Sequence, residues 1–312
     1  MRFSLISSSW CPPCYLKLVL VVGGLFGSLP SQGQGYAEGL SLTYEYLPLK
    51  FTAPGQPSFH ADVWRASIVV PRPIAGDSAQ QLLVGANVET LRFSGDPSGL
   101  AVSQVYGLAP ILGYRRRFSP TLELTALALP ALNSDLREVR GADLTWGGLV
   151  RVVRRVNPRL SYRATLGYRQ QFYGPQYVLL LGLDWQAGSR WRLFGDLPTT
   201  FTVSYALAPR VNAGFNLLGL NTAYRLHEQD RYFQYQQGHY GLFAETYLSS
   251  HWVVRATVAY AVARRLGVFA KNDQWPATLD YVGLGSAPSP LSEPINKGLA
   301  FRFAVSYRVP QR

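Results

Sequence analysis

The segment that most constrains the fold is the C-terminal one, where apolar and polar side chains alternate from Gly298 to Val309. Its apolar or aromatic positions are Leu299, Phe301, Phe303, Val305, Tyr307 and Val309, and the residues between them are Ala300, Arg302, Ala304, Ser306 and Arg308. Successive side chains of a β-strand point to opposite faces of a sheet. A strand with apolar groups on one face and arginines on the other suits a wall between lipid and a wet interior. Because the alternation recurs along the chain, the sequence predicts an all-β, transmembrane antiparallel β-barrel.

The N-terminal residues 1–35 carry the pattern of a cleavable secretion signal. Arg2 and Lys17 supply positive charge, Leu18–Phe26 is an unbroken apolar run, and small and polar residues follow it as far as Gly35. The run is too short for a membrane-spanning helix, which needs about 20 residues. We therefore expect a signal peptide over residues 1–35 and a single barrel domain over residues 36–312, located in the outer membrane of a Gram-negative cell.

The cysteines and the charge exclude two other classes of protein. Cys11 and Cys14 both precede the apolar run, so they would be removed with the signal, and a redox role is disfavoured. A net charge of +12 would permit nucleic-acid binding. The arginines are instead spread through alternating strands, and no run of them forms a basic patch. The expected partners are outer-membrane lipids and the barrel-assembly machinery, with no nucleic acid and with an unidentified solute.

Turn-forming residues punctuate the chain at short intervals and favour many strands over helices. We expect fourteen strands, with twelve as the main alternative and sixteen as a weaker one. Their approximate ranges are 39–50, 61–71, 81–93, 103–117, 121–132, 142–156, 159–173, 176–186, 190–197, 199–207, 211–225, 238–248, 251–263 and 298–309. Strands 190–197 and 199–207 are the weakest of these predictions, because Leu197-Pro198 is either a turn or a kink.

The connections fall into two kinds, which gives the barrel a direction. Tight turns are predicted at 118–121, 156–159, 187–190, 208–210 and 249–250, and longer loops at 51–60, 94–102, 133–141, 226–237 and 271–297. Bacterial barrels have short periplasmic turns and longer external loops. This assignment places both ends of the barrel domain in the periplasm. Segment 71–80 is a longer inner connection that fits the scheme less well, and 271–297 is expected to be irregular.

The alternation also predicts which charged side chains face the interior. The candidate lumen charges are Arg65, Arg151, Arg163, Arg255, Arg302, Glu45, Glu89, Glu123, Asp184 and Glu245. The two signs are equally represented, whereas an anion pore would be expected to have net positive walls. The pattern therefore indicates a lumen laced by ion pairs and partly filled by them.

Aromatic residues gather near the predicted strand ends. Trp185, Trp191, Trp252 and Tyr307 lie beside predicted inner turns and are candidate interface aromatics. Aromatic rings that carry one polar group favour the membrane–water boundary. The alternative is that they reflect ordinary strand propensity.

A group of motifs in the middle of the chain resembles those of a known protein family. The motifs are Pro175–Trp185, Trp191–Phe194, Leu197-Pro198, Asn212–Phe215 and Leu218–Leu220. With them the chain resembles an uncharacterised, porin-like family of outer-membrane β-barrel proteins of Gram-negative bacteria. The resemblance implies the barrel fold and transfers no activity or functional residue.

The sequence offers little for catalysis. Its four histidines are His60, His227, His239 and His251, and none belongs to a nucleophile motif or has metal-ligand spacing on a helix. We expect no enzyme activity, cofactor or metal. Two functions remain: a channel or small-solute uptake protein with a partly plugged, charge-laced lumen, and a closed structural or recognition barrel that acts through its external loops. An outer-membrane lipid hydrolase is a distant third alternative.

Overall fold

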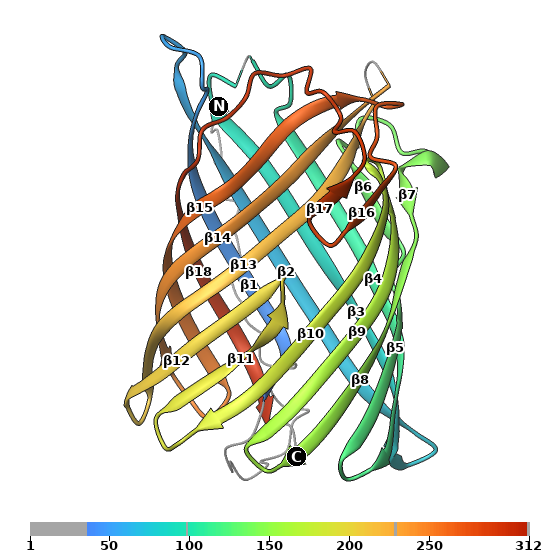
Figure 1. Cartoon of the computed structure of the whole chain (residues 1–312), viewed down its shortest axis with the longest axis vertical. Helices are drawn as coiled ribbons and strands as arrows, with labels where there is room; N and C mark the ends of the chain where they lie inside the picture. The colour runs from blue at the N-terminus through green and yellow to red at the C-terminus, as the bar shows by residue number, and fades with distance from the viewer. Residues whose placement is uncertain (1–35, 98, 228–229, 311–312) are drawn as a thin grey trace, which may run out of the picture. The chain divides into compact units, whose positions relative to one another are not determined.

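The described part of the chain forms a closed antiparallel β-barrel (Figure 1). The computed structural model describes residues 36–310 except positions 98 and 228–229. The signal peptide predicted for residues 1–35 lies outside the described residues.

Fourteen strands make the wall, and two of them are interrupted. They are β1 (Tyr36–Lys50), β2 (Ser58–Ile74), β3 (Asp77–Gly95), β4 (Gln104–Ser119), β5 (Leu122–Ala128) continued by β6 (Ala131–Ser134), β7 (Leu144–Thr145) continued by β8 (Gly147–Asn157), β9 (Leu160–Gln171), β10 (Gly174–Ala187), β11 (Trp191–Leu197), β12 (Thr200–Ala208), β13 (Val211–Leu226), β14 (Arg231–Tyr247), β15 (Trp252–Ala270) and β18 (Gly298–Pro310). Consecutive wall strands pair antiparallel, and β18 closes the barrel on β1 from Tyr36↔Pro310 to Tyr46↔Phe301. The predicted fold and strand number are confirmed.

Three of the predicted connections are wrong. Residues 226–237 are not a long loop, because β14 already begins at Arg231. Segment 71–80 is strand on both sides of a tight turn at Ala75 and Gly76, and its prolines had hidden the extension of β2. Segment 271–297 is not wholly irregular, because β16 (Ala277–Leu279) and β17 (Val282–Leu284) form a short hairpin within it.

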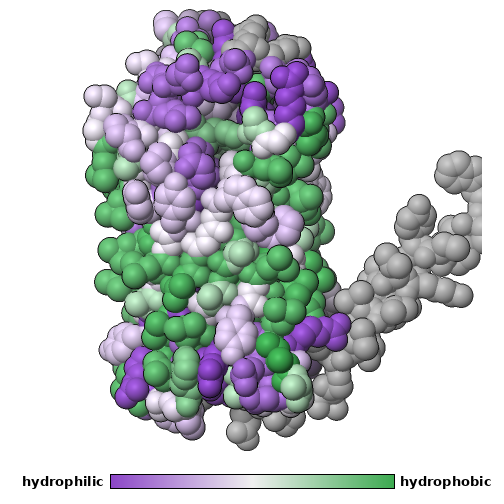
Figure 2. All heavy atoms as spheres, turned by 90° about the vertical axis from the view of Figure 1, so that its right-hand side faces the viewer, coloured by the Kyte–Doolittle hydropathy of each residue, from purple (hydrophilic) through white to green (hydrophobic). Residues whose placement is uncertain are grey.

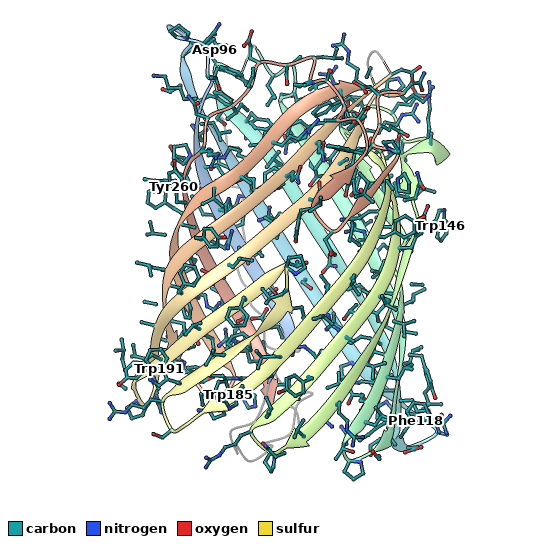
Figure 3. The ribbon with its side chains drawn as sticks, in the orientation of Figure 1. Asp96, Phe118, Trp146, Trp185, Trp191 and Tyr260 are labelled. Carbon is teal, nitrogen blue, oxygen red and sulfur yellow. The ribbon has the colours of Figure 1, made fainter. Side chains whose placement is uncertain are left out.

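The two ends of the barrel differ. We call the end that carries the tight turns the turn end and the opposite end the loop end. Figure 3 shows Phe118, Trp185 and Trp191 near the turn end and Asp96 at the loop end. The loop end also carries a short 3₁₀ helix, η1 (Gly141–Asp143), within the loop that joins β6 to β7.

The outer face is apolar over a belt between two polar ends. Outward-pointing side chains such as Leu112, Leu166, Leu181, Leu242 and Phe303 are largely exposed. Figure 2 shows the resulting hydrophobic band around one side of the barrel, with hydrophilic residues above and below it. Exposed apolar area on this scale is what a lipid-facing wall requires. Among the described residues, no helix is long and apolar enough to cross a membrane.

The loop half of the barrel closes as a smaller ring. β7 pairs with β6 only at Ala131 and Leu132, and the last residue of β6 pairs in parallel with β13 instead, at Ser134↔Arg225. The Asp135 N–H donates to the Arg225 carbonyl at 3.1 Å. The ring therefore contains β1, β2, β3, β4, β6, β13, β14, β15 and β18, and excludes the wall from β7 to β12. Phe59, Phe93, Tyr224 and Phe233 are among the buried side chains that pack across it. A packed core therefore fills this part of the interior.

Leu181→Arg and Leu248→Arg test the lipid belt as a matched pair. Leu181 is 65% exposed in the middle of β10, and Leu248 is 63% exposed at the β14–β15 turn. An arginine near the bilayer midplane of a barrel costs about 2–4 kcal/mol and one near the interface about 0–1 kcal/mol. We expect Leu181→Arg to lower the free energy of unfolding in lipid vesicles, measured by urea titration, far more than Leu248→Arg. Equal losses would contradict a membrane belt at this height.

Candidate functional site

The barrel interior is the candidate site, and its most buried part is a polar cluster at the base of the packed core. Glu45 on β1 is fully buried, and each of its carboxylate oxygens accepts from an arginine at 2.7 Å, Oε2 from Arg65 and Oε1 from Arg302. Arg65 also bonds Glu89 on β3. Because two carboxylates face two guanidinium groups, the cluster carries no net charge. The structure brings four of the ten candidate lumen charges together here.

Three residues that the candidate set did not contain complete this cluster. The Tyr224 hydroxyl donates to Glu89 from β13, and the Arg65 guanidinium donates to the Tyr235 hydroxyl at 3.3 Å. The imidazole of His239 lies 3.4 Å from Glu45 and 3.1 Å from Arg302. The tyrosines carried no sequence signal for this role, because aromatic residues are common in any strand. They link β13 and β14 to β2 and β3 across the interior.

The remaining candidate charges form separate groups in the turn half. Asp196 on β11 accepts from Arg163 at 2.8 Å and from Arg151 at 3.4 Å. Arg163 also donates to the Gly195 carbonyl at 2.9 Å. Asp196 is an interior charge that the candidate set did not contain. The two-residue period places Asp196 on the same face of β11 as Arg192, so the sequence could have identified both as inward-facing. Both were left out because this short strand was one of the weakest predictions.

Glu123, Asp184 and Glu245 each pair with arginines of neighbouring strands. The Glu123 carboxylate lies 3.4 Å from Arg155, and Asp184 lies 2.8 Å from Arg192. Glu245 receives Arg255 at 2.5 Å and Arg308 at 3.0 Å. Arg192, Arg155 and Arg308 had not been included in the candidate set.

Solvent reaches the ion pairs of the turn half. The side chains of Arg151 and Arg155 are 34% and 27% exposed although they point inward. In the central cluster Glu45 has no exposure, and Arg65 and Glu89 are 20% exposed. The interior therefore changes from a packed apolar core in the loop half, through a partly exposed cluster, to a turn half whose charged walls contact more water.

The candidate interface aromatics lie on the outer surface near the turn end. Trp185, Trp191 and Trp252 are exposed. Trp191 packs on Tyr205, and Tyr307 packs edge-on against Trp252 with ring centroids 5.3 Å apart. Exposed indoles at one height are typical of the boundary between hydrocarbon and head groups.

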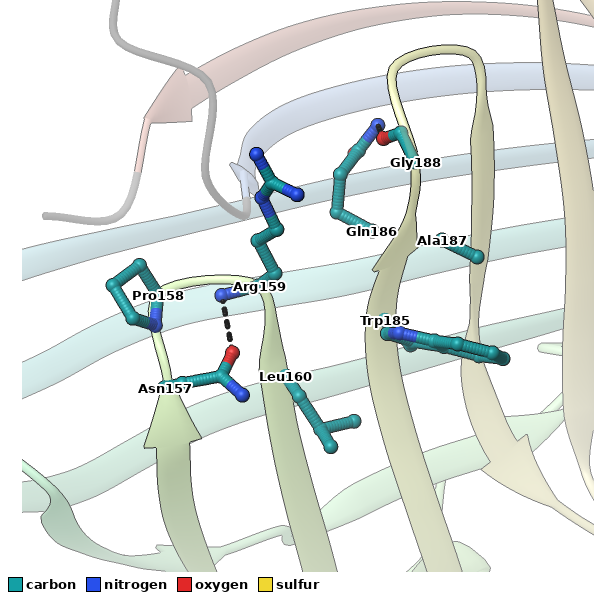
Figure 4. A pocket seen from close by; sticks show the side chains of 8 residues that line it. All are labelled: Asn157, Pro158, Arg159, Leu160, Trp185, Gln186, Ala187 and Gly188. Atoms are coloured by element: carbon teal, nitrogen blue, oxygen red, sulfur yellow. Dashed lines mark hydrogen bonds between the residues drawn. The ribbon is translucent and has the colours of Figure 1, made fainter.

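A groove of about 500 Å³ lies beside Trp185, between the β8–β9 and β10–β11 turns (Figure 4). The Arg159 backbone N–H donates to the Asn157 side-chain oxygen at 2.8 Å, which fixes the first turn. The Arg159 guanidinium extends from this turn beside the second one (Figure 4). A cation next to an interfacial indole suits contact with anionic lipid head groups.

The histidines offer no metal centre within the part of the chain that the structure describes. No group of three or more His, Cys, Asp or Glu side chains there could hold a metal ion. His251 bonds Ser250 at 2.7 Å on the exposed β14–β15 turn. His227 lies 2.7 Å from Glu138 at the loop end. The Arg140 guanidinium donates to Glu138 and lowers the pKa of that carboxyl below its ordinary value.

The comparison with protein families identifies the chain's relatives. The profile of a family described as "Domain of unknown function (DUF6268)" matches residues 78–272. The chain belongs to this family. The match runs from β3 past the end of β15, and it confirms the predicted membership of an uncharacterised family. Among curated proteins, none matches the chain.

Solved structures with a similar barrel form are channels and transporters. An outer-membrane channel from Pseudomonas putida F1 has 9% identity over 90% of this chain and 100% of that chain, with a TM-score of 0.40. The P. putida toluene transporter TodX has 11% identity over 90% and 91% of the two chains, with a TM-score of 0.43. P. putida OprB has 8% identity over 88% of this chain and 94% of that chain, with a TM-score of 0.40. Similarity at this level identifies no solute for the present chain.

Glu45→Gln tests the central cluster, with Glu138→Gln as its exposed control. Removing one member of a buried ionic group leaves the other charges uncompensated, at a cost of about 3–5 kcal/mol. We expect Glu45→Gln to lower the free energy of unfolding by that order. Solvent screens the exposed pairs of Glu138, so Glu138→Gln should have a far smaller effect. Urea titration in lipid vesicles measures both, and similar losses would show that the Glu45 cluster is not sealed from water.

Proposed function

We propose that the protein is an outer-membrane channel or uptake barrel for small solutes and that the structure represents its closed state. The observation that carries this proposal is the water-accessible, charge-lined interior of the turn half. A barrel with a purely structural role has no need of inward-facing charges that remain in contact with solvent. Small barrels fill their interiors with side chains, whereas wider ones leave aqueous space.

The charge pattern supports a weakly selective pore. Three acids of the turn half, Glu123, Asp184 and Asp196, have six arginines within about 4 Å, so each acid is compensated and the walls keep a net positive charge. Ion-selective pores use unbalanced rings of one sign. Because the surplus arginines share their acids, we expect a weak preference for anions over cations and passage of uncharged solutes.

The membrane orientation is part of the proposal. Short turns face the periplasm in bacterial barrels and longer loops face outward. The turn end carries the exposed indoles of Trp185 and Trp191 together with Arg159, which suit the inner head-group region. The interior that contacts water then opens towards the periplasm.

One observation favours the second candidate function, a closed recognition barrel. The loop half is sealed by a continuous packed core, which includes Leu47, Phe93 and Phe233. If this core never opens and no other route exists, the protein acts through its external loops alone.

Arg163→Ala distinguishes the two functions, with Arg210→Ala as a rim control. Arg163 joins β9 to Asp196 and to the Gly195 carbonyl of β11, so its loss widens the turn half and leaves Asp196 with one arginine fewer. We expect the unmodified protein to pass little current in planar bilayers and Arg163→Ala to pass more, with a shift towards cations. Arg210 is exposed at a turn, and its replacement should change neither property. Folded barrels that pass no ions and no small sugars in any of these forms would favour the recognition barrel.

A further inference from the structure

The wall of the barrel has a gap above its two short strands. β11 and β12 have 7 and 9 residues, and the turn between them lies part-way up the wall (Figure 1). In the described chain, β10 therefore pairs with β11 only from Leu181 onward. On the other side of the gap, the β12 partners of β13 end at Leu218. Two strand edges face each other across this gap, and unpaired edges are costly at membrane depth.

The β16–β17 hairpin occupies this gap. β16 pairs in parallel with β10 at Gln176↔Thr278 and Tyr177↔Leu279, and the Asp280 N–H donates to the Tyr177 carbonyl at 2.8 Å. At the other edge, the Tyr281 hydroxyl donates to the Gly219 carbonyl of β13 at 2.8 Å. A side chain at Gly219 would collide with the Tyr281 ring, so the glycine permits this contact.

The outer surface of the hairpin continues the wall. Leu279, Val282 and Leu284 are exposed apolar side chains, and Leu279 lies beside Tyr177 of β10. In Figures 1 and 3 the hairpin lies at about the height of the labelled Trp146 and Tyr260. Exposed aromatic rings at one height mark the membrane–water boundary. The hairpin therefore forms wall at the level where amphipathic molecules collect.

This section of the wall has fewer backbone pairings than the rest and depends more on side-chain hydrogen bonds. The Leu179 N–H donates to the Asp280 side chain at 3.2 Å, and Gln236 of β14 donates to the Tyr281 carbonyl at 3.0 Å. On one side of β10, β16 forms two register pairs with it. On the other side, β9 pairs with β10 in an unbroken register from Gly174↔Gln171 to Trp185↔Leu160. On β13 the described residues hold the hairpin through the Tyr281 side chain. Segments with few backbone bonds open at low free-energy cost, well below global unfolding.

The surfaces that pack against each other beneath the hairpin carry amides and aromatic rings. The outward face of β14 turns aromatic and polar at Tyr232 and Gln234, and segment 271–297 buries it together with Ala223 of β13. Tyr232, Phe269 and Tyr173 pack together there, with Trp275 against them. Gln176 of β10 faces the same hairpin and donates to the Asp280 carbonyl at 2.9 Å.

Three buried polar atoms in this space have no hydrogen-bond partner in the described chain. They are the hydroxyl of Tyr173 and the side-chain carbonyls of Gln176 and Gln234. The amide nitrogens of both glutamines are already used, by the Asp280 carbonyl and by Asn221. A buried acceptor without a partner is costly, and a molecule that donates hydrogen bonds would relieve that cost. The set matches an uncharged molecule with an apolar ring and hydroxyl groups.

We propose that the β16–β17 hairpin is a movable section of the wall, and that the space beneath it receives small uncharged amphipathic solutes that donate hydrogen bonds. The proposal rests on the proposed channel function and gives its route. A solute passes from the membrane boundary under the hairpin and bypasses the packed core of the loop half. It then follows the inward face of β10, past Val178, Leu180 and Gly182, to the wet ion pairs around Asp196.

A disulfide that locks the hairpin to β10 tests the proposal. Tyr177 and Leu279 are register partners on the outer surface, so Tyr177→Cys with Leu279→Cys can form the lock. The matched control joins Tyr177→Cys to Tyr168→Cys, its partner on β9, where no movement is proposed. No cysteine occurs after residue 14 to interfere.

The measurement is uptake of 4-nitrophenyl glucoside into vesicles that contain a glucosidase. We expect the oxidised lock to reduce uptake to that of protein-free vesicles and a reductant to restore it, while the control pair transports like the unmodified protein. Uptake that continues through the oxidised lock would overturn the movable hairpin and leave the channel function standing.

A second variant covers the case in which the unmodified protein transports nothing. Replacing residues 277–284 by a short Gly-Ser linker removes the hairpin and should admit the glucoside. Uptake by this variant alone would support the hairpin as the seal. Folded barrels that exclude the glucoside with and without the hairpin would overturn both the route and the channel function.

Discussion

Every backbone N–H and C=O group in a membrane-spanning wall needs a partner within the protein, and this requirement organises the whole structure. β11 and β12 are too short to meet it along the full height of β10 and β13. Two features compensate. The loop half closes as a smaller ring through β6 and β13, and the β16–β17 hairpin covers the free edge of β10. A single shortage of strand length thus accounts for the sealed core and for the patched wall beside it.

The smaller ring explains why the interior has two regions. Because β13 lies close to β3, β4 and β6 in the loop half, apolar side chains such as Phe93 and Phe233 fill the interior there and exclude water. At the base of this core, Glu45 and Glu89 are compensated by Arg65 and Arg302, because an unpaired charge in a dry interior would be far more costly. Below it the full set of wall strands encloses a wider space, and Arg151 and Arg155 remain in contact with water.

The sequence predicted those parts of the fold in which one face of a strand meets lipid and the other a polar interior. Leu166 and Arg163 on β9, or Phe303 and Arg302 on β18, alternate because their surroundings alternate. The loop half of β14 has no such contrast, since Tyr232 and Gln234 are buried under segment 271–297 while Phe233 and Tyr235 are buried in the core. Strands buried on both faces lose the two-residue signal. The hairpin strands have three residues each, too few for any periodicity. The ion pairs that cross the interior depend on distances between strands, so Asp196 as the partner of Arg163 could not be deduced from spacing.

The central claim is that the loop half of the interior is dry and the turn half is wet, and single cysteines at two depths test it most directly. Ala61 lies in the packed core on β2, and Ser161 faces the turn half on β9, opposite Arg155 and Asp184. We predict that a water-soluble thiol reagent modifies Ser161→Cys in the folded barrel and leaves Ala61→Cys unmodified until the barrel is unfolded in urea. Modification of Ala61→Cys as rapid as that of Ser161→Cys, in a barrel shown to be folded, would contradict the account.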